Sequence, residues 1–146
     1  SALGDVIADA QLAYTQSAGA DLAFMNPGGI RADLTFPSSP VGEGDGVVTY
    51  GEAFSVQPFN NLVLTQDMTG QQIKDTLEQS FVGCFGRTQS TTILQVSANF
   101  TYSYSTLSSC GSRIRAKASL RMRATPFGHL PSVSEHMSTW FLPSRL

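Results

Sequence analysis

The segment LAFMNPGGIR, residues 22–31, decides how this chain is expected to fold. Its first four residues, Leu22 to Met25, form an apolar run of the length of a buried strand. Asparagine, proline and two glycines follow directly, and residues of these types mark turns. The pattern therefore predicts a buried strand that runs into a tight turn, with Arg31 beside that turn.

Helices are expected on both sides of this strand in the sequence. Over residues 2–17, apolar residues recur every three or four positions, which predicts an amphipathic helix that Gly19 would end. A second helix is expected to begin at Thr69, because Thr69-Gly70-Gln71-Gln72 has the spacing of a capping box. Apolar residues at positions 73, 77 and 81 would form its buried face.

Further strands are expected at residues 62–67, 93–96 and 100–104, where β-prone residues are concentrated. Residues 35–46 are rich in proline, glycine and serine, which predicts a surface loop. Strands mixed with helices indicate an α/β fold of the mixed α+β kind.

The composition indicates one globular unit and excludes some classes of partner. The chain has 146 residues, of which 41% are hydrophobic and 14% charged, which is enough for one sizeable core. A net charge of −2 provides no basic field for nucleic acid. No apolar run approaches the roughly 20 residues of a membrane span. Because no leader segment is recognisable, we interpret the chain as a mature protein or a fragment.

The turn after the first strand carries groups that can bind a ligand. Gly28 and Gly29 would let a ligand approach the backbone closely. The guanidinium of Arg31 suits a carboxylate or phosphate, and Asn26 adds an amide that donates and accepts. The residues alone equally allow a purely structural turn, in which Arg31 pairs with Asp33.

A second candidate is the segment Gln57-Pro58-Phe59-Asn60-Asn61, at an expected junction between a helix and a strand. Phe59 stands among polar and turn-forming residues, so its ring could stack on a flat ligand. The alternative is that Phe59 fills part of the apolar core, which is the commoner role of such a residue.

The sequence shows no catalytic centre of its own. Its aspartates are scattered, without the clustering of His and Asp that a two-metal phosphatase requires. His129 and His136 lie in a segment without periodicity, and we interpret them as surface residues. No serine stands in a nucleophile elbow. The chain is therefore expected to bind a ligand and not to hold metal ions.

Four segments taken in order resemble the carboxyl-terminal domain of the secreted 5′-nucleotidase family. They are LGDVIADAQ, GADLAFMNPGGIRADL, GVVTYGEAFSVQPFNNLVLTQDMTGQQIKDTLEQ and LQVSANFTYSY, and the resemblance covers residues 3–114. It implies that this domain recognises the nucleoside part of a nucleotide. It also implies a separate amino-terminal metallophosphoesterase domain that carries two divalent metal ions, and an extracellular, periplasmic or cell-surface location.

The family's motif assigns roles to particular residues. Asn26 and Arg31 would contact the ribose and phosphate side of the nucleotide. Phe59 would form one face of an aromatic clamp around the base, and Asn61 would contact the base edge. Gly28 and Gly29 would shape the turn. The two cysteines, Cys84 and Cys110, follow an expected helix and an expected strand, and could form a disulfide at one end of the domain.

The chain also departs from the family. Asp5 stands where relatives often have asparagine, and residues 115–146 do not match the family's second clamp phenylalanine and Gly-Gly-Asp-Gly turn. We therefore predict a domain at 1–114 without its final strands, with an unpaired sheet edge, and an aberrant tail. With suitable codons, residues 126–136 read one base downstream spell a run that resembles the family's. This indicates a frame slip near residues 113–123, which the nucleotide sequence would test.

The resemblance favours a recognition domain of an enzyme that releases phosphate from nucleoside 5′-monophosphates. The isolated chain is predicted to be inactive, because the metal ions belong to the other domain. One alternative is a 2′,3′-cyclic-nucleotide phosphodiesterase with 3′-nucleotidase activity, or a nucleotide-sugar hydrolase. Another is a non-catalytic extracellular module that binds nucleotides or has a structural role.

Overall fold

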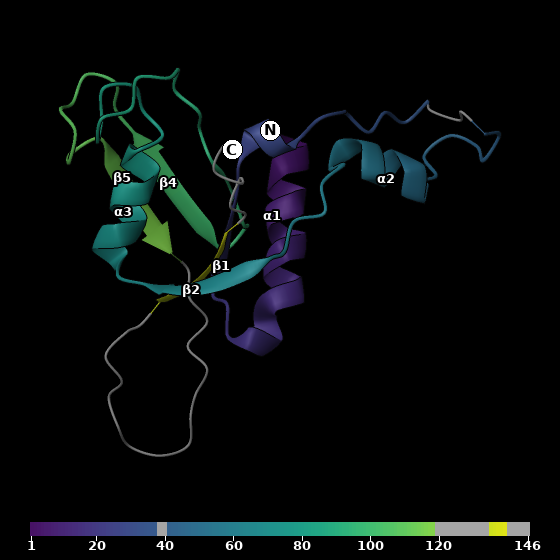
Figure 1. Ribbon diagram of the computed structural model, residues 1–146, viewed down its shortest axis with the longest axis horizontal. Coiled ribbons are helices and arrows are strands. Elements are labelled where there is room, and N and C mark those ends of the chain that lie inside the picture. The colour runs from purple at the N-terminus through teal and green to yellow at the C-terminus, as the bar shows by residue number, and fades with distance from the viewer. Residues whose placement is uncertain (38–40, 119–134, 140–146) are drawn as a thin grey trace, which may run out of the picture.

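The structure, a computed structural model, describes residues 1–37, 41–118 and 135–139. Helices and strands are mixed along the chain, which confirms the predicted fold class (Figure 1). The elements follow the order α1 (Ala2–Thr15), η1 (Gln16–Ala18), β1 (Leu22–Met25), η2 (Pro27–Gly29), α2 (Tyr50–Val56), β2 (Leu64–Met68), α3 (Gly70–Glu78), β3 (Gln95–Val96), β4 (Phe100–Tyr104), β5 (Ile114–Ala118) and β6 (Glu135–Thr139), where η marks a 3₁₀ turn.

The predicted first strand, β1, lies inside a four-stranded sheet of order β2-β6-β1-β3. It runs parallel to β6 and antiparallel to β3, and β2 is antiparallel to β6. Strands β4 and β5 form a separate antiparallel pair. All four residues of β1 are buried, which explains why its sequence is a continuous apolar run instead of an alternating one.

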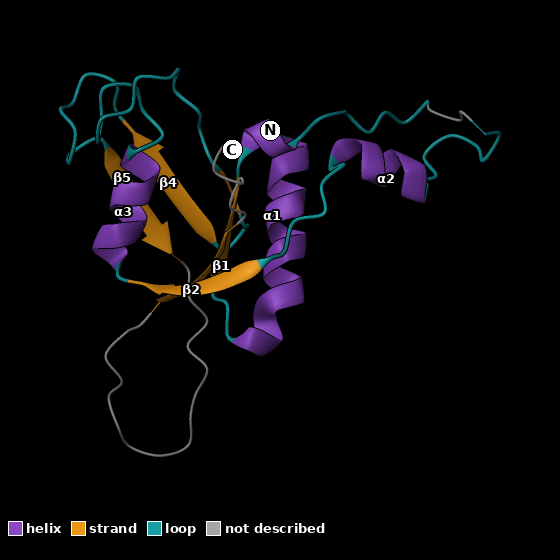
Figure 2. Cartoon of the chain, in the orientation of Figure 1, coloured by secondary structure: helices purple, strands orange, loops and turns teal. Residues whose placement is uncertain are grey.

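Strand β1 has a different apolar cluster on each face. Leu22 and Phe24 join side chains of α3, β4 and β5 in the larger cluster. Ala23 and Met25 pack with Ala8 of α1 in the smaller one. Figure 2 shows the resulting arrangement, with α1 on one side of the sheet and α3 with the β4–β5 pair on the other.

Both predicted helices form, and local signals mark their starts, but α3 ends at Glu78, so the buried Phe81 lies beyond it. Ser1 caps α1, and Gly19 ends the following turn with φ 89° and its N–H on the Gln16 carbonyl. Thr69 and Gln72 form both hydrogen bonds of the predicted capping box at the start of α3. Helix α2 also begins with a capping box, formed by Thr49 and Glu52, but its seven residues are too few to show a clear period.

Strands β2, β3 and β4 confirm the three further predicted strands, with bounds shifted by up to two residues. The structure adds β5 and β6, which the sequence pattern did not indicate. Strand β6 comes from the segment expected to be an aberrant tail, and it pairs with both β1 and β2. Strand β5 begins at Ile114, where the matching region was expected to end. The division at 114 remains a prediction.

Helix α1 covers the outer edge of strand β3. Its Gly4 allows a close approach, because a Cβ at that position would lie 2.3 Å from Gln95 Cγ. One helical turn apart, Asp5 and Asp9 accept hydrogen bonds from the backbone N–H groups of Val96 and Ala98, at 3.4 and 2.7 Å. The carboxylates thus satisfy donors that an edge strand would otherwise expose.

Candidate functional site

The turn after β1 is built around the side chain of Asn26. Asn26 is the N-cap of η2, and its Oδ1 accepts a hydrogen bond from the Gly28 N–H at 3.1 Å. Ile30 N–H closes the turn on the Pro27 carbonyl. Since the side-chain oxygen stabilises the turn, the amide nitrogen of half-buried Asn26 is the group left to donate to a ligand.

Arg31 follows this turn and is exposed to solvent. Its backbone N–H donates to the Val56 carbonyl at 2.8 Å, which ties the residue to the end of α2. Its Nη1 donates to the Gly28 carbonyl at 3.3 Å and not to Asp33, the partner that the structural alternative required. Most of the guanidinium donors of Arg31 therefore face solvent at the turn, where they can meet an anion.

The two glycines of the turn have different roles. Neither Gly28 nor Gly29 has a positive φ, so the backbone conformation alone does not require glycine. A Cβ on buried Gly29 would lie 2.7 Å from Met25 Cε, whereas one on exposed Gly28 would meet only the Asn26 side chain, from 3.4 Å. A side chain at position 29 would thus have to displace the end of the buried Met25 side chain.

Phe59 and Asn61 lie in the connection from α2 to β2, and both are half-buried. Phe59 belongs to neither apolar cluster formed by the described residues. Its ring makes no aromatic contact among the described residues. No hydrogen bond or ring contact in the described part of the chain joins Phe59 or Asn61 directly to Arg31.

Contacts made by Val56, Gln57 and Met25 bring the two predicted segments together. Val56 accepts the hydrogen bond from Arg31, and Gln57 Nε2 donates to Met25 Sδ at 3.5 Å. The Gln57 carbonyl accepts a bond from Phe59 N–H at 2.8 Å. Met25 and Gln57 lie within segments that the sequence analysis singled out but had no role assigned there, and Val56 was not singled out. The sequence carries no signal that these residues meet. The site therefore consists of the Asn26–Arg31 turn and the Gln57–Asn61 segment, joined at the end of α2.

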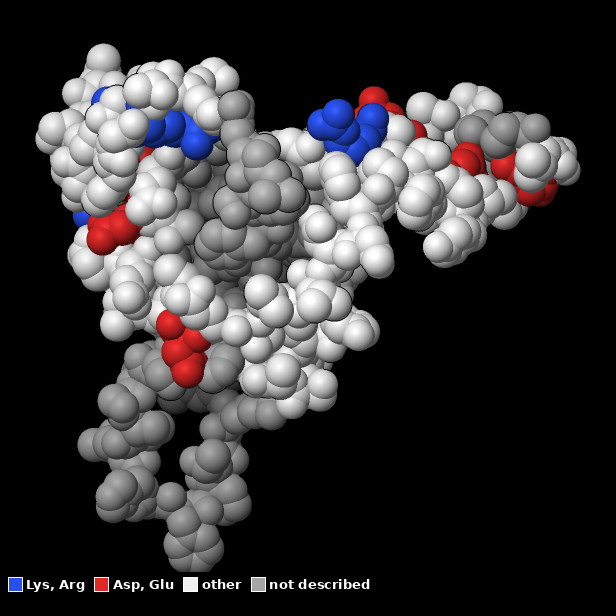
Figure 3. Space-filling model, in the orientation of Figure 1, with Lys and Arg blue, Asp and Glu red and all other residues white. Residues whose placement is uncertain are grey.

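An apolar groove of about 350 Å³ lies between α1 and α2, beside this junction. Its walls include Leu3, Val6 and Tyr14 of α1, and Gln57 stands at its border with the turn. Figure 3 shows a mostly uncharged surface with a few separate groups of charged residues, and acidic residues lie beside the basic group at the upper right. The groove thus adds apolar surface beside the end of α2.

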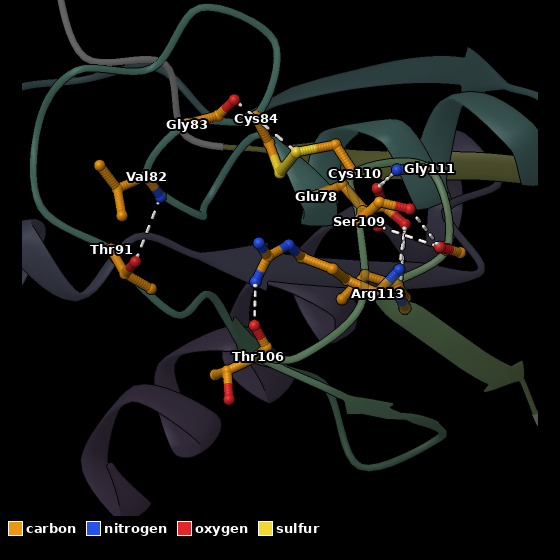
Figure 4. Close-up of a disulfide and its surroundings, with 12 residues drawn as sticks. Glu78, Val82, Gly83, Cys84, Thr91, Thr106, Ser109, Cys110, Gly111 and Arg113 are labelled. Carbon is orange, nitrogen blue, oxygen red and sulfur yellow. Dashed lines mark hydrogen bonds between the residues drawn. A yellow bond between two sulfur atoms is a disulfide. The ribbon is translucent and has the colours of Figure 1, made fainter.

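The cysteines lie at the other end of the domain. Cys84 and Cys110 form a disulfide with a Cα–Cα distance of 5.5 Å. Beside the disulfide, the fully buried carboxylate of Glu78 accepts hydrogen bonds from the backbone N–H groups of Gly111, Arg113 and Ile114 (Figure 4). These contacts fix the loop between β4 and β5 against α3.

The described part of the chain contains neither a cluster of metal ligands nor a helix suited to span a membrane. Within residues 1–37, 41–118 and 135–139, no group of three or more His, Cys, Asp and Glu residues is placed to hold a metal ion. His129 lies outside the described residues, and the backbone of His136 pairs with Asp67 between β6 and β2. None of the described helices has the length and apolar character needed to cross a membrane.

Comparisons with known proteins identify the family. The family described as "5′-nucleotidase, C-terminal domain" matches residues 1–126. The chain is 42% identical over 84 residues to the cell wall protein Lmo0130 of Listeria monocytogenes, covering 56% of this chain and 10% of that protein. It is 45% identical over 78 residues to the trifunctional nucleotide phosphoesterase protein YfkN of Bacillus subtilis, covering 53% of this chain and 5% of that protein.

A solved structure supports the same assignment. The crystal structure of a 5′-nucleotidase precursor from Thermus thermophilus matches with a TM-score of 0.65 and 28% identity, over 94% of this chain and 25% of that chain. The chain thus spans about a tenth or less of the curated relatives named above and a quarter of the solved relative. The chain belongs to the family of 5′-nucleotidase carboxyl-terminal domains.

Proposed function

We propose that this chain is the nucleotide-recognition domain of a 5′-nucleotidase-type hydrolase. In this proposal, Arg31 and Asn26 bind the ribose and phosphate side of a nucleoside monophosphate. Phe59 stacks on the base, and Asn61 contacts its edge. The observation that carries the proposal is the junction at the end of α2, where Arg31 N–H bonds to the Val56 carbonyl one residue before the Gln57–Asn61 segment.

The chemistry of the side chains supports this division of the ligand. Arg31 presents a permanently charged fork that suits phosphate oxygens. Phe59 is half-buried without belonging to the core, so one part of its ring can remain available to a base. A base stacked on an aromatic ring gains roughly 1 to 3 kcal/mol, and any base can be accommodated because each has a π-face.

In this proposal, hydrolysis takes place on a different domain of a longer protein. We propose that two divalent metal ions reside on an amino-terminal metallophosphoesterase domain and activate the attacking water there. The role of the present residues is to hold the nucleoside in place during that reaction. The isolated chain should therefore bind nucleotides without releasing phosphate from them, and a metal-dependent release of phosphate from AMP would contradict this division.

Isothermal titration calorimetry with AMP, adenosine and inorganic phosphate tests the recognition role. Arg31→Ala should weaken AMP binding about tenfold and leave adenosine binding nearly unchanged, because it removes a charged contact to phosphate. Phe59→Ala should weaken both. Arg115→Ala is a matched control, since Arg115 is an exposed arginine on β5. Absence of AMP binding by the wild-type chain, or equal losses from Arg31→Ala and Arg115→Ala, would refute the proposal.

Two alternatives are each favoured by one relative. The similarity to a trifunctional nucleotide phosphoesterase favours a broader nucleotide substrate, such as a cyclic nucleotide or a nucleotide sugar. The similarity to a cell wall protein favours an extracellular or cell-surface location, and is compatible with a non-catalytic module. Titrations with 2′,3′-cyclic AMP and UDP-glucose would separate the first alternative from AMP recognition. The gene segment upstream of this chain would reveal whether a metallophosphoesterase domain is present.

A further inference from the structure

We infer that Met25 and Gln57 form a joint that holds the two halves of the candidate site in one arrangement. In this inference, Gln57 is a positioning residue: it fixes the Gln57–Asn61 segment relative to the Asn26–Arg31 turn and does not itself bind the nucleotide. The functional part of the inference rests on the proposed nucleotide recognition. The structural part can be tested without any ligand.

The sulfur of Met25 is the centre of the joint. Met25 is the last residue of β1 and only 1% of its surface is exposed. Its Sδ accepts hydrogen bonds from Gln11 Nε2 and Gln57 Nε2, both at 3.5 Å. A thioether is a weak acceptor, so two amide donors on one sulfur are an uncommon use of a core methionine. The contacts bring α1, β1 and the end of α2 to a single atom.

Gln11 shows that this arrangement carries a cost. The side chain of Gln11 is buried, with 5% exposed, and its Oε1 has no hydrogen-bond partner among the described residues. An unsatisfied buried amide oxygen lowers stability. An apolar residue at position 11 would avoid that cost, but it would remove one of the two donors that orient the Met25 thioether.

The Asn26–Arg31 turn lies next to Met25 and Gln57 at Gly29. A Cβ on Gly29 would lie 2.7 Å from the methyl carbon of Met25 and 3.9 Å from Gln57 Nε2. Two residues later, Arg31 N–H donates to Val56, the neighbour of Gln57. A shift of the Gln57 side chain would therefore move Met25, which contacts the turn at Gly29. A shift of the Gln57 backbone would move Val56, which accepts the hydrogen bond from Arg31.

Gln57 also makes a backbone contact with Phe59. The Gln57 carbonyl accepts the Phe59 N–H at 2.8 Å, and Pro58 between them restricts the backbone. Gln57 is thus joined by its side chain to the segment that carries Arg31 and by its backbone to the segment that carries Phe59. A residue that only filled the groove between α1 and α2 would need neither of the two polar contacts.

The first test measures amide hydrogen exchange in the full 146-residue chain by NMR. Gln57→Leu removes the donor, and Met25→Leu removes the acceptor with little change in volume. Each should raise the exchange rate of Arg31 N–H roughly tenfold, because local opening becomes easier. Exchange at Ile73 N–H, which bonds to the Thr69 carbonyl in α3, should stay unchanged. Gln89→Leu, at an exposed loop position, is the matched control.

A uniform rise at Arg31 and Ile73 would indicate general destabilisation and would overturn the inference. So would unchanged exchange at Arg31 in both variants. Because two independent substitutions address the same contact, poor folding of one variant leaves the other to decide the outcome.

The second test measures AMP affinity by calorimetry. Gln57→Leu should weaken AMP binding roughly fivefold, an effect that Gln89→Leu should not produce. The double-mutant cycle of Arg31→Ala and Phe59→Ala should show coupling in the wild-type background and less coupling in the Gln57→Leu background. An unchanged affinity and an unchanged cycle would overturn the positioning role while leaving nucleotide recognition intact. If the wild-type chain binds no AMP, the proposed function fails, and the exchange data alone decide whether the joint exists.

Discussion

The two ends of this domain are stabilised in different ways. At the end formed by α3, β4 and β5, a disulfide and a buried carboxylate hold one loop in place (Figure 4). Arg113 N–H and Ile114 N–H bond to Glu78 Oε1, and the Arg113 guanidinium lies over the Phe81 ring at 5.8 Å. This loop is fixed by a disulfide, hydrogen bonds to a buried carboxylate and a cation–π contact together.

The end formed by α2 and the turn after β1 has fewer constraints. The turn is held by short-range hydrogen bonds, by the backbone bond from Arg31 to Val56 and by the contact of Gln57 with Met25. Helix α2 exposes a stacked aromatic pair, in which Tyr50 is 85% and Phe54 is 51% exposed. Such a surface is adjustable, because few buried contacts would be broken by a small movement.

This difference indicates that stability and recognition are located in separate parts of the domain. Changes near the disulfide should lower the free energy of unfolding with little effect on nucleotide affinity. Changes near Met25 and Gly29 should affect the site with a smaller effect on unfolding. The four predictions below test this separation, beginning with the largest expected effect.

Reduction of the disulfide should have the largest effect on stability. Cys84 and Cys110 are 26 residues apart, and closing a loop of this size stabilises by about 3 kcal/mol in the chain-entropy model. Urea unfolding with and without dithiothreitol measures this loss. The double variant Cys84→Ala/Cys110→Ala controls for direct effects of the reductant, which should be absent. A large loss of AMP affinity on reduction, with the chain still folded, would break the proposed separation.

Glu78→Gln should destabilise the domain by about 2 kcal/mol. The glutamine offers one acceptor oxygen in place of two, and its NH₂ group would face a backbone N–H that the carboxylate now accepts. Urea unfolding of the variant gives the free energy directly. Asp45→Asn, at an exposed loop position, makes the same kind of change and should be neutral. Equal stability of the two variants would show that the buried carboxylate is dispensable.

Gly29→Ala should cost about 1 kcal/mol, because the added methyl group must displace the buried end of Met25. Gly28→Ala is the matched control: its methyl group meets only ordinary contacts and should change stability little. Thermal unfolding compares the two. In contrast to Glu78→Gln, Gly29→Ala should also weaken AMP binding. If Gly28→Ala proves the more disruptive change, the proposed role of Gly29 is wrong.

The smallest effect concerns alkaline pH. Burial, followed by the nearby Tyr104 and Asp5, raises the pKa of Tyr102 from 10.0 to about 12. The unfolded chain therefore loses this proton at lower pH than the folded chain. The contribution of Tyr102 to the free energy of unfolding is fully present below pH 10 and falls as the pH rises toward 12. Urea unfolding at several pH values should show a shallower decline for Tyr102→Phe than for the wild type.

The control for that series is Tyr14→Phe, since Tyr14 is 79% exposed. Tyr102→Phe also removes the hydrogen bond from the Tyr102 hydroxyl to the Leu94 carbonyl, so a constant offset between the curves is expected. The prediction concerns their slopes. Parallel curves for wild type and Tyr102→Phe above pH 10 would contradict it.

Much of the secondary structure could be predicted because its signals are local. The apolar spacing of α1 and the capping box of α3 each lie within a few turns of helix, and both helices appear where expected. A helix was expected before Gln57, but no bounds could be predicted for α2 because it is short and contains glycine. Strand β6 was missed because Glu135–Thr139 has no alternating apolar pattern, and its place between β1 and β2 depends on pairing with distant strands.

The candidate site was predicted in part for the same reason. Asn26, Arg31, Phe59 and Asn61 stand out because they follow recognisable strand, turn and helix signals and match a family motif. Their assigned contacts with a nucleotide remain predictions. Gln57 and Met25 did not stand out, since a glutamine and a core methionine have many ordinary roles in sequence.

The sequence by itself determined the local elements, the family and the residues most suited to meet a nucleotide. These features depend on neighbours within a few positions, where apolar spacing and turn chemistry are directly visible. Only the tertiary structure decided that Gln11 and Gln57 meet at the sulfur of Met25, and that Glu78 binds a loop more than 30 residues away. Such contacts join segments far apart in the chain, and their partners are chosen by packing, which no local pattern records.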